Sequence, residues 1–357
     1  MKNLVLVINP GSTSTKIAVY DKSGKEIINE TLRHNSSELS KYEKIIDQYH
    51  FRADTIKDIL SKDNISTRDF MFIVGRGGFL KPISGGTWTV NSKMIKDLKK
   101  AERGEHASNL GAIIAYDIAK DMNIPSYIVD PIVVDELDDV ARISGIPEIE
   151  RTSVFHALNQ KATARKAAAA LGKKYEKVNV IVAHMGGGVT VGAHKKGRVV
   201  DVNNGIYGEG PMSPERSGSL PAEDVVNMCF SGKYTKDQMA KKIHGRGGVL
   251  AYLGTGDIKE VSEEAKNGNK KFKLIHDAMA YQVAKEIGAM AAVLDGKVDC
   301  IALTGGIAYD KSMVKKITTR VKFISKVMVY PGENEMEALF QGAMLSVTGK
   351  ANLNEYK

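Results

Sequence analysis

The chain opens with a pattern of apolar and polar segments that predicts a strand, a tight polar turn and a second strand. Apolar residues fill positions 4–8, small and polar residues follow, and positions 17–20 are again apolar. Near the middle of the chain, the apolar residues 180–183 lead into a glycine-rich turn and then an alternating strand. Each copy continues through a charged loop containing glycine into a third apolar strand, which is typical of β-hairpins.

Helical and strand patterns alternate along the rest of the chain. Helices are expected at Tyr42 to Leu60, Met94 to Lys99, Asn109 to Met122, Ala157 to Leu171, Pro221 to Phe230, Phe272 to Leu294 and Met336 to Val347. Further strands are expected at Phe70 to Val74, Tyr127 to Val129, Lys297 to Leu303 and Val327 to Val329. The stretch from Asn203 to Pro221 is rich in Gly, Pro and Ser and predicts a long loop, which is more often functional than idle.

Both hairpin turns carry groups suited to binding phosphate. Glycine lets backbone N–H groups approach an anion, hydroxyls donate hydrogen bonds, and lysine adds a positive charge. The candidates are Gly11, Ser12, Ser14 and Lys16 in the first turn, and Gly186, Gly187 and Gly188 in the second. The repeat predicts two similar α/β domains with their phosphate turns at a shared central cleft. A chance resemblance between two hairpins remains the alternative.

Composition narrows the class of protein. A chain of 357 residues, 43% hydrophobic and 26% charged, is long enough for two cores. The net charge of +9 is spread through mixed-charge helical segments and aromatic residues make up only 6%, so nucleic acid is not the expected partner. Two cysteines outside any metal-binding pattern, no signal peptide and no long apolar run predict a cytoplasmic protein that does not span a membrane.

Standard motifs do not explain the chemistry. The Walker motif GxxxxGK[ST], GxGxxG, HExxH and the hydrolase motif GxSxG are all absent. Polar residues instead follow the predicted strands, at Asn9, Arg76, Asp130, His184 and Thr304. Ligands of open α/β sheets bind at the ends of strands, so these positions predict a binding cleft.

The order of motifs resembles the acetate kinase family of the actin-like, sugar-kinase-like phosphotransferases. The segment 5–16 resembles that family's N-terminal signature, and the remaining motifs follow in the family's order over essentially the whole chain: GRGG at 75–78, VDP at 129–131, FHA at 155–157, HMGGG at 184–188, RSG at 216–218 and TGGI at 304–307. The variants GRGG, HMGGG and PERSG are similar to the butyrate kinase subfamily.

The resemblance implies a fold and a division into domains. The fold is two duplicated ribonuclease-H-like domains around a cleft. The expected N-terminal domain is 1–152 with 339–357, including a returning C-terminal helix, and the nucleotide domain is 153–338. The resemblance also implies a homodimer or higher homo-oligomer, with the helix from Phe272 to Leu294 as either an interface or a buried helix.

The implied reaction is reversible transfer of phosphate from MgATP to a short-chain carboxylate, giving ADP and an acyl phosphate. Such a carboxylate is already ionised, so the site needs cations and donors to offset repulsion rather than a strong base. The resemblance assigns catalysis to Arg76, Asp130, His156 and Arg216, and substrate contacts to His106 and Phe155. It assigns nucleotide contacts to both turns and to His184, Asp257, Lys259, Gly305, Gly306, Ile307 and Asp310.

The resemblance also implies which residues bind magnesium and which residue lines the pocket for the acyl group. Asn9, Asp130 and Glu335 are the expected magnesium residues, and Glu333 is the alternative to Glu335. Gly78 stands where acetate kinases tend to have a branched residue, so the missing side chain is expected to leave room for butyrate or isobutyrate, unless a backbone turn requires the glycine. Acetate, propionate or a sugar remains an alternative acceptor, and a nucleotide-dependent clamp like actin is the alternative outside enzymes.

Overall fold

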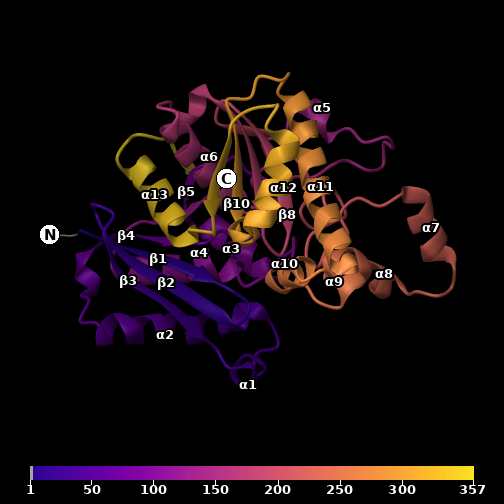
Figure 1. The fold of residues 1–357 in the computed structure, drawn as a ribbon. Helices are drawn as coiled ribbons and strands as arrows, with labels where there is room; N and C mark the ends of the chain where they lie inside the picture. The colour runs from indigo at the N-terminus through magenta and orange to yellow at the C-terminus, as the bar shows by residue number, and fades with distance from the viewer. Residues whose placement is uncertain (1–2) are drawn as a thin grey trace. The chain divides into compact units, whose positions relative to one another are not determined.

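The computed structural model describes residues 3–357 and contains two mixed β-sheets (Figure 1). The first sheet has seven strands in the order β12-β5-β6-β4-β1-β2-β3. They are β1 (Leu4–Pro10), β2 (Ser14–Asp21), β3 (Glu26–Arg33), β4 (Phe70–Gly75), β5 (Thr87–Thr89), β6 (Ser126–Val129) and β12 (Leu353–Glu355). The first three strands form an antiparallel meander, and β4 and β6 continue from β1 in parallel.

The second sheet has five strands in the order β11-β10-β7-β8-β9. They are β7 (Asn179–Met185), β8 (Val189–Lys195), β9 (Arg198–Val202), β10 (Cys300–Gly305) and β11 (Val327–Pro331). Here too the first three strands form an antiparallel meander and two parallel strands follow beside the first. The two sheets share this five-strand order, so the duplication predicted from the two hairpins is confirmed.

Helices cover both faces of the first sheet. The helices of this part of the chain are α1 (Ser36–Leu39), α2 (Tyr49–Lys62), α3 (Ser92–Lys100), α4 (Asn109–Asp121) and α13 (Glu335–Val347). Leu6 and Val19 pack with Ile56 of α2 in one core cluster. Because side chains alternate along a strand, Tyr20 faces the other way, where its ring stacks on Phe340 of α13 with 4.7 Å between centroids. Figure 1 shows α2 and α13 on opposite sides of the sheet.

The second sheet is also a middle layer. Its helices are α5 (Asp139–Arg142), α6 (Ala157–Ala170), α7 (Ala222–Phe230), α8 (Lys236–Ile243), α9 (Gly248–Leu253), α10 (Ile258–Lys266), α11 (Lys270–Val293) and α12 (Lys311–Val321). Ile181 packs with Val283 of α11, whereas Val182 packs with Ala164 and Ala167 of α6. The alternation of these neighbouring residues places α11 and α6 on opposite faces.

The helices α6 and α13 each pack on the sheet that the other half of the chain forms. In chain order α6 follows the strands β1 to β6, but it packs on β7 and β10 of the second sheet. Conversely, α13 follows the second sheet and packs on β1, β4 and β6 of the first. Each sheet is therefore completed by a helix from the other half of the chain, as expected for a returning C-terminal helix.

The compact units have different limits from the expected domains. The first unit ends at Val134 and resumes at Asn334–Lys357, and the second unit is Asp135–Glu333. The sequence placed these limits at 152 and 338. The segment after Val134 joins the second unit because the Asp138 N–H donates to the Val200 carbonyl at 3.0 Å and Arg151 pairs with Asp201 at 3.0 Å.

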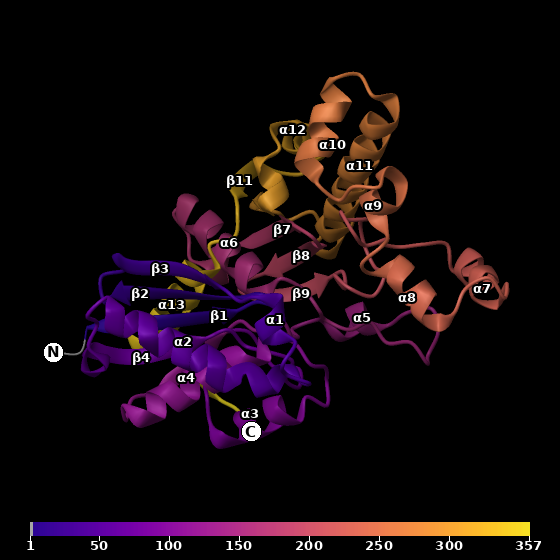
Figure 2. The same cartoon turned by 90° about the horizontal axis from the view of Figure 1, so that it is seen from below.

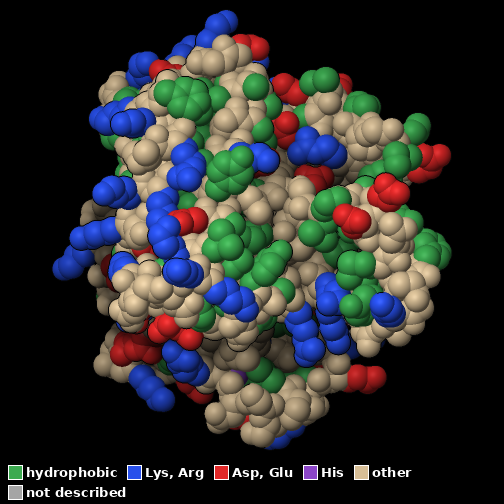
Figure 3. All heavy atoms as spheres, turned by 45° about the vertical axis from the view of Figure 1, so that its right-hand side comes forward, with side chains coloured by type: hydrophobic (Ala, Val, Ile, Leu, Met, Phe, Trp, Pro, Cys, Tyr) green, Lys and Arg blue, Asp and Glu red, His purple; other side chains and the backbone are tan. Residues whose placement is uncertain are grey.

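Several elements differ from the sequence pattern. The helix predicted at residues 42–60 begins at Tyr49, after a 3₁₀ turn at Ile45–Gln48, and the short helices α8, α9 and α10 were not predicted. The helix α7, which lies near α8 in Figure 2, has no buried residue. In residues 3–357, none of the helices combines the length and the apolar character that a membrane span needs. On the face drawn in Figure 3, Lys and Arg side chains lie among acidic and hydrophobic ones.

Glycines at the end of β4 allow an unusually close approach of α4. A Cβ atom added to Gly75 would lie 2.2 Å from the Gly111 carbonyl oxygen, and one added to Gly111 would lie 2.5 Å from the Arg76 carbonyl oxygen. Real side chains do not tolerate such contacts with backbone atoms. The two glycines therefore let the first turn of α4 pack directly on the loop that carries Arg76.

Replacement of Gly111 by alanine tests this close approach. Intrinsic helix propensity favours alanine by about 1 kcal/mol. We nevertheless expect Gly111→Ala to lower the free energy of unfolding by about 3 kcal/mol, because the new methyl group meets backbone atoms that cannot move aside. Guanidinium denaturation followed by circular dichroism measures this change.

Gly288→Ala in α11 is the matched control. A Cβ atom at Gly288 meets nothing within 4 Å, so we expect this variant to be as stable as the wild type or about 1 kcal/mol more stable. Equal effects of the two substitutions would contradict the packing argument.

Candidate active site

The first glycine turn is held from behind by a buried arginine. The Gly11 N–H donates to the Ser14 carbonyl at 2.7 Å, which closes the turn between β1 and β2. Arg52 of α2 is 0% exposed, and its Nη1 donates to the Gly11 carbonyl at 2.8 Å and to the Ser14 carbonyl at 2.9 Å. Its Nη2 donates to the Ser12 carbonyl at 3.1 Å. Arg52 thus fixes three carbonyl groups of the turn.

Arg52 keeps its charge in an unusual setting. Burial lowers the pKa of its guanidinium, although an arginine stays protonated near neutral pH. Its side-chain partners are Gln48 and the Thr15 hydroxyl, and no ion pair within residues 3–357 includes it. A positive charge that no carboxylate neutralises therefore lies behind the turn. The sequence reasoning missed it, because Arg52 lies in a helix with no motif around it.

A cavity of about 390 Å³ adjoins this turn in the first unit. Its lining includes predicted residues of the first phosphate turn, the substrate site and the metal site: Asn9, Gly11, Ser14, Lys16, Arg76, His106 and Glu335. Glu335, in the first turn of α13, accepts a hydrogen bond from Asn9 Nδ2 at 2.7 Å and pairs with Arg76. The fold therefore brings these three residues, which are distant in the sequence, into contact.

His106 presents a neutral ring to the same cavity. The Ser108 N–H donates to His106 Nδ1 at 3.1 Å, so Nδ1 is an acceptor and the ring proton lies on Nε2. Burial, and secondarily the charge of Arg76, lower the pKa of His106 below its ordinary value. Near neutral pH this histidine is an uncharged donor.

Asp130 lies at the end of β6, as predicted, in a strained conformation. It is 1% exposed, its φ is 38°, and its Oδ1 accepts a hydrogen bond from the Gly86 N–H at 2.6 Å. Backbone strain of this kind persists where the surroundings impose it and often marks a functional position. Within residues 3–357, no three His, Cys, Asp or Glu side chains cluster as a ready metal site.

Gly78 does not leave the room that the sequence suggested. A Cβ atom there would lie 2.3 Å from Asn109 Oδ1 and 2.5 Å from Asn109 Cα, so α4 occupies the space. The expectation that Gly78 enlarges an acyl pocket is wrong, and close packing against Asn109, rather than a backbone turn, accounts for the glycine. Gly77 and Ile132 line the cavity instead. Ser12 is exposed and outside the lining.

The second turn is closed in the same way as the first. The Gly186 N–H donates to the Gly188 carbonyl at 3.0 Å. Just before it, His184 is 1% exposed, and its Nδ1 lies 2.8 Å from Asn159 Oδ1. His184 Nε2 is 3.1 Å from Glu333 Oε1, within range of an ion pair if the ring is charged but outside hydrogen-bond geometry. Asn159 Oδ1 can only accept, so Nδ1 carries the ring proton, and Nε2 of the uncharged ring is a buried acceptor without a hydrogen-bond partner among residues 3–357.

His156 lies beside His184. Their rings stack with 3.8 Å between centroids and an interplanar angle of 12°. His156 Nδ1 lies 2.9 Å from Thr190 Oγ1, which fixes the ring against β8. Phe155, predicted to contact substrate, is buried next to it. The two histidines expected near the second turn are therefore in contact.

Arg216 reaches the second turn from the long loop. Its Nη1 donates to the Gly205 carbonyl, and a Cβ atom on Gly188 would lie only 2.1 Å from that nitrogen. The same Cβ would lie 3.3 Å from His156 Cε1, so Arg216 and His156 flank Gly188. Burial lowers the pKa of Arg216, and the nearby charge of Glu215 partly opposes this. Gly188 is needed here for the approach of a guanidinium group.

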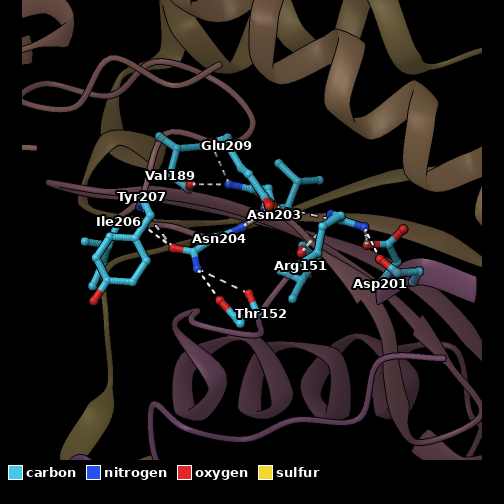
Figure 4. Close-up of polar contacts among 12 residues, drawn as sticks. Arg151, Thr152, Val189, Asp201, Asn203, Asn204, Ile206, Tyr207 and Glu209 are labelled. Atoms are coloured by element: carbon cyan, nitrogen blue, oxygen red, sulfur yellow. Dashed lines mark hydrogen bonds and ion pairs between the residues drawn. The ribbon is translucent and has the colours of Figure 1, made fainter. Parts of the chain in front are cut away.

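A network of polar contacts shapes the start of the loop that holds Arg216 (Figure 4). Asn204 donates to the Thr152 carbonyl at 3.2 Å, and its side-chain oxygen accepts from the Tyr207 N–H at 3.0 Å. The Asn204 N–H donates to Glu209 at 2.9 Å, and Arg151 donates to the same carboxylate at 3.4 Å. Gly205, between these anchors, thereby keeps its carbonyl in place for Arg216. The sequence predicted that this loop matters but not these residues.

A larger cavity of about 810 Å³ lies in the second unit. Predicted nucleotide residues in its lining are Gly186, Gly187, Asp257, Lys259, Gly306, Ile307 and Asp310. Gly305 is outside the lining; its φ is 89° and a Cβ there would lie 2.3 Å from the Met185 carbonyl, so it allows close packing on β7. His184 and Gly188 are also outside it.

Two acidic residues of this cavity are helix caps. Asp257 accepts from the Lys259 N–H at 2.8 Å at the start of α10. Asp310 Oδ1 accepts from the Ser312 N–H at 2.8 Å, and its Oδ2 accepts from His276 at 2.7 Å. Burial raises the pKa of Asp310, but the hydrogen bond from His276 and further donors outweigh this and bring it to about 2. Both oxygens are engaged, so Asp310 shapes the cavity edge.

Glu333 and Glu335, between which the sequence did not decide, belong to different units. Glu333 ends the second unit and faces His184, whereas Glu335 belongs to the first unit with Asn9 and Arg76. That the two turns serve one ligand remains a prediction.

Comparisons with known proteins agree with this geometry. The model of the Acetokinase family matches residues 148–340. Butyrate kinase 2 of Clostridium acetobutylicum is 56% identical over 357 residues, covering 100% of each chain. The solved acetate kinase of Porphyromonas gingivalis has a TM-score of 0.80 at 19% identity, covering 97% of this chain and 100% of that one. A propionate kinase from Francisella tularensis has a TM-score of 0.75 at 18% identity, covering 95% and 98%. These two structures share the fold.

Replacement of Arg52 by methionine tests its role behind the first turn. We expect Arg52→Met to lower the free energy of unfolding by about 3 kcal/mol, because three carbonyl groups lose a charged donor in a buried place. Arg68→Met, at an exposed position of the same unit, should change it by less than about 0.5 kcal/mol. Urea denaturation measures both, and equal stability of the two variants would exclude the proposed support of the turn.

Proposed function

We propose that this chain, which belongs to the acetokinase family, is a short-chain carboxylate kinase that acts on butyrate or a related C3–C5 acid. Family membership makes it an ATP-dependent phosphotransferase with a carboxyl group as acceptor. The observation that carries the choice of acid is the full-length similarity to a protein named butyrate kinase. The expected products are butyryl phosphate and ADP, and the reaction is reversible.

The reaction makes simple demands on the protein. A carboxylate oxygen forms a bond to the γ-phosphorus of ATP while the bond from that phosphorus to the bridging oxygen breaks, and ADP leaves with the electron pair. The acid is ionised near neutral pH, so no base has to remove a proton. Repulsion between the carboxylate and the phosphate oxygens must instead be offset by positive charge and hydrogen-bond donors.

The two site arginines are placed to meet these demands. Arg76 lies in the first unit's cavity and already binds a carboxylate, that of Glu335. A guanidinium that binds one carboxylate suits another, and on this basis we assign Arg76 to the substrate carboxylate. Arg216 has only the Gly205 carbonyl as a hydrogen-bond acceptor within residues 3–357. We assign Arg216 to the phosphoryl group in transfer.

Two histidines supply donors. His106 is an uncharged Nε2–H donor in the first cavity. His156 touches the space beside Gly188 and Arg216, and we assign it to the transferred phosphoryl group. His184 lies behind the second turn, where we assign it to the nucleotide half of the site as a support for the stacked His156, because its ring proton is directed at Asn159 Oδ1 and its Nε2 is an acceptor.

We assign magnesium to carboxylates of the first unit. Mg²⁺ takes oxygen ligands, usually one or two carboxylates completed by water and phosphate, so a cluster of three acidic residues is not required. Asp130 and Glu335 are the carboxylates that would hold it, with the Asn9 amide beside Glu335. When bound, the ion offsets negative charge on the phosphate oxygens.

The larger cavity in the second unit suits the nucleotide. Its volume of about 810 Å³ falls in the range of small-molecule sites. Lys259, Lys266 and Lys311 in its lining provide positive charge for phosphates. We assign ATP and ADP to this cavity, with the Gly186 to Gly188 turn at the phosphate end.

Trapping of the acyl phosphate with hydroxylamine tests the function. The acids are acetate, propionate, butyrate, isobutyrate and valerate, with glucose as a neutral acceptor. Each buried methylene contributes about 0.8 kcal/mol, so we expect kcat/KM for butyrate to exceed that for acetate roughly 10-fold. A higher value for acetate or propionate would assign the alternative acid. ADP release that needs no acceptor would instead indicate a nucleotide-dependent clamp.

Replacement of Gly188 tests the placement of Arg216. The added methyl group of Gly188→Ala meets the flexible end of Arg216, so we expect it to displace the guanidinium without unfolding the protein. The kcat should fall about 100-fold, the usual effect of losing one transition-state donor. Gly145→Ala, where a Cβ meets nothing within 4 Å, should leave kcat unchanged. Retention of wild-type kcat by Gly188→Ala would contradict the role of Arg216.

A further inference from the structure

A buried row of polar residues runs behind His156 in the second unit. Thr190 and His194 lie on β8 and are both 0% exposed. Alternate residues of a strand face the same side, so Gly192 lies between them on that side. A Cβ atom on Gly192 would lie 2.4 Å from Gln160 Oε1. The place of the missing side chain is therefore filled by Gln160 from α6, itself 0% exposed.

The orientation of the Gln160 amide follows from its partners. Its Nε2 lies 3.0 Å from the Thr190 carbonyl oxygen, which can only accept, so this end must be the NH₂ group. The same NH₂ group donates to Thr190 Oγ1 at 2.8 Å. Its Oε1 lies 3.0 Å from His194 Nε2 and accepts a hydrogen bond from it. Gln160 thus has a fixed direction, with its acceptor toward His194 and its donors toward Thr190.

His194 is neutral and continues the row. Burial, followed by the charges of Lys161 and Arg165, holds the pKa of His194 well below its ordinary value. Its one ring proton lies on Nε2, toward Gln160, so Nδ1 is an acceptor. The Tyr175 hydroxyl lies 2.7 Å from Nδ1 and donates to it. Every proton from Tyr175 to Thr190 therefore points in one direction along the row.

The last step reaches His156. Thr190 Oγ1 accepts a hydrogen bond from Gln160, so its own hydroxyl can donate to His156 Nδ1, which lies 2.9 Å away. We propose that Tyr175, His194, Gln160 and Thr190 form a positioning chain that holds His156 with its proton on Nε2, as an uncharged donor to the phosphoryl group. This inference rests on the proposed function for the role of the donor, but the tautomer itself does not depend on it.

Other groups around His156 favour the neutral ring. The His184 ring is stacked on the His156 ring with 3.8 Å between centroids. The Arg216 guanidinium and the His156 ring both lie beside Gly188. A second positive charge beside Arg216 is unfavourable. Glu333 is an acidic group near this pair, with Oε1 3.1 Å from His184 Nε2. The positioning chain itself adds no carboxylate at Nδ1, in contrast to sites where an acidic residue stabilises a charged histidine.

The tautomer can be observed directly in the whole protein. The chain has eight histidines, and His156→Gln identifies the His156 signals in the spectrum of ¹⁵N-histidine-labelled protein. At about pH 7.5 we expect His156 to show a protonated Nε2 and an unprotonated Nδ1. A protonated Nδ1, whether the ring is neutral or charged, would overturn the proposal. This measurement needs no activity, so it is separate from the acyl phosphate assay.

Variants along the chain test the link to turnover. Thr190→Val is isosteric but lacks the hydroxyl, and Gln160→Met removes the amide that directs it. In both variants we expect a mixture of His156 tautomers. The kcat should fall by about 10-fold to about 100-fold, the larger value being the usual effect of losing a donor. The KM for ATP should change by less than about 2-fold. Thr190→Ser keeps the hydroxyl and should restore the single tautomer and most of kcat. Altered kcat with an unaltered tautomer in Gln160→Met would reject the chain as a positioning device.

Discussion

The interaction on which both half-sites depend is the binding of a buried guanidinium group to backbone carbonyl groups. Arg52 holds three carbonyls of the first turn, and Arg216 holds the Gly205 carbonyl beside the second. Carbonyl oxygens orient a guanidinium without cancelling its charge, and removing such a charge from water is unfavourable. Burial lowers the pKa of both arginines for that reason. In the proposed function, an anionic ligand supplies the missing countercharge, which gives the fold a reason to keep these two cations.

The sequence predicted the repeated turns because their information is local. Strand, glycine turn and strand occupy adjacent positions, and this order recurs in both copies. The supports of the turns were not predictable in this way. Arg52 reaches the first turn from a helix, and Asn204 and Glu209 shape a loop through contacts with Thr152 and Arg151. None of these residues has a distinctive neighbour in the sequence, and only the packed structure shows what they touch.

Glycine was the residue type most easily misinterpreted. A missing side chain at Gly78 suggested empty space, yet Asn109 occupies it, and at Gly192 Gln160 does the same. In a close-packed interior the volume released by a glycine is filled by a neighbour. Whether that neighbour is ligand, side chain or backbone depends on long-range contacts. The exchange of α6 and α13 between the sheets also depends on long-range contacts, and the domain limits differ from the expected ones because the segment after Val134 packs with the second unit.

The two histidines assigned to the reactants share one design, although they come from different units. His106 receives the Ser108 N–H at its Nδ1, and in the proposed arrangement His156 receives the Thr190 hydroxyl at the same atom. In each case the protein uses the inner nitrogen as an acceptor, so the outer nitrogen carries the proton. A site built for proton removal needs a free basic nitrogen facing the reactants. Two outward N–H groups instead suit a reaction whose nucleophile is already ionised and whose developing charge needs donors.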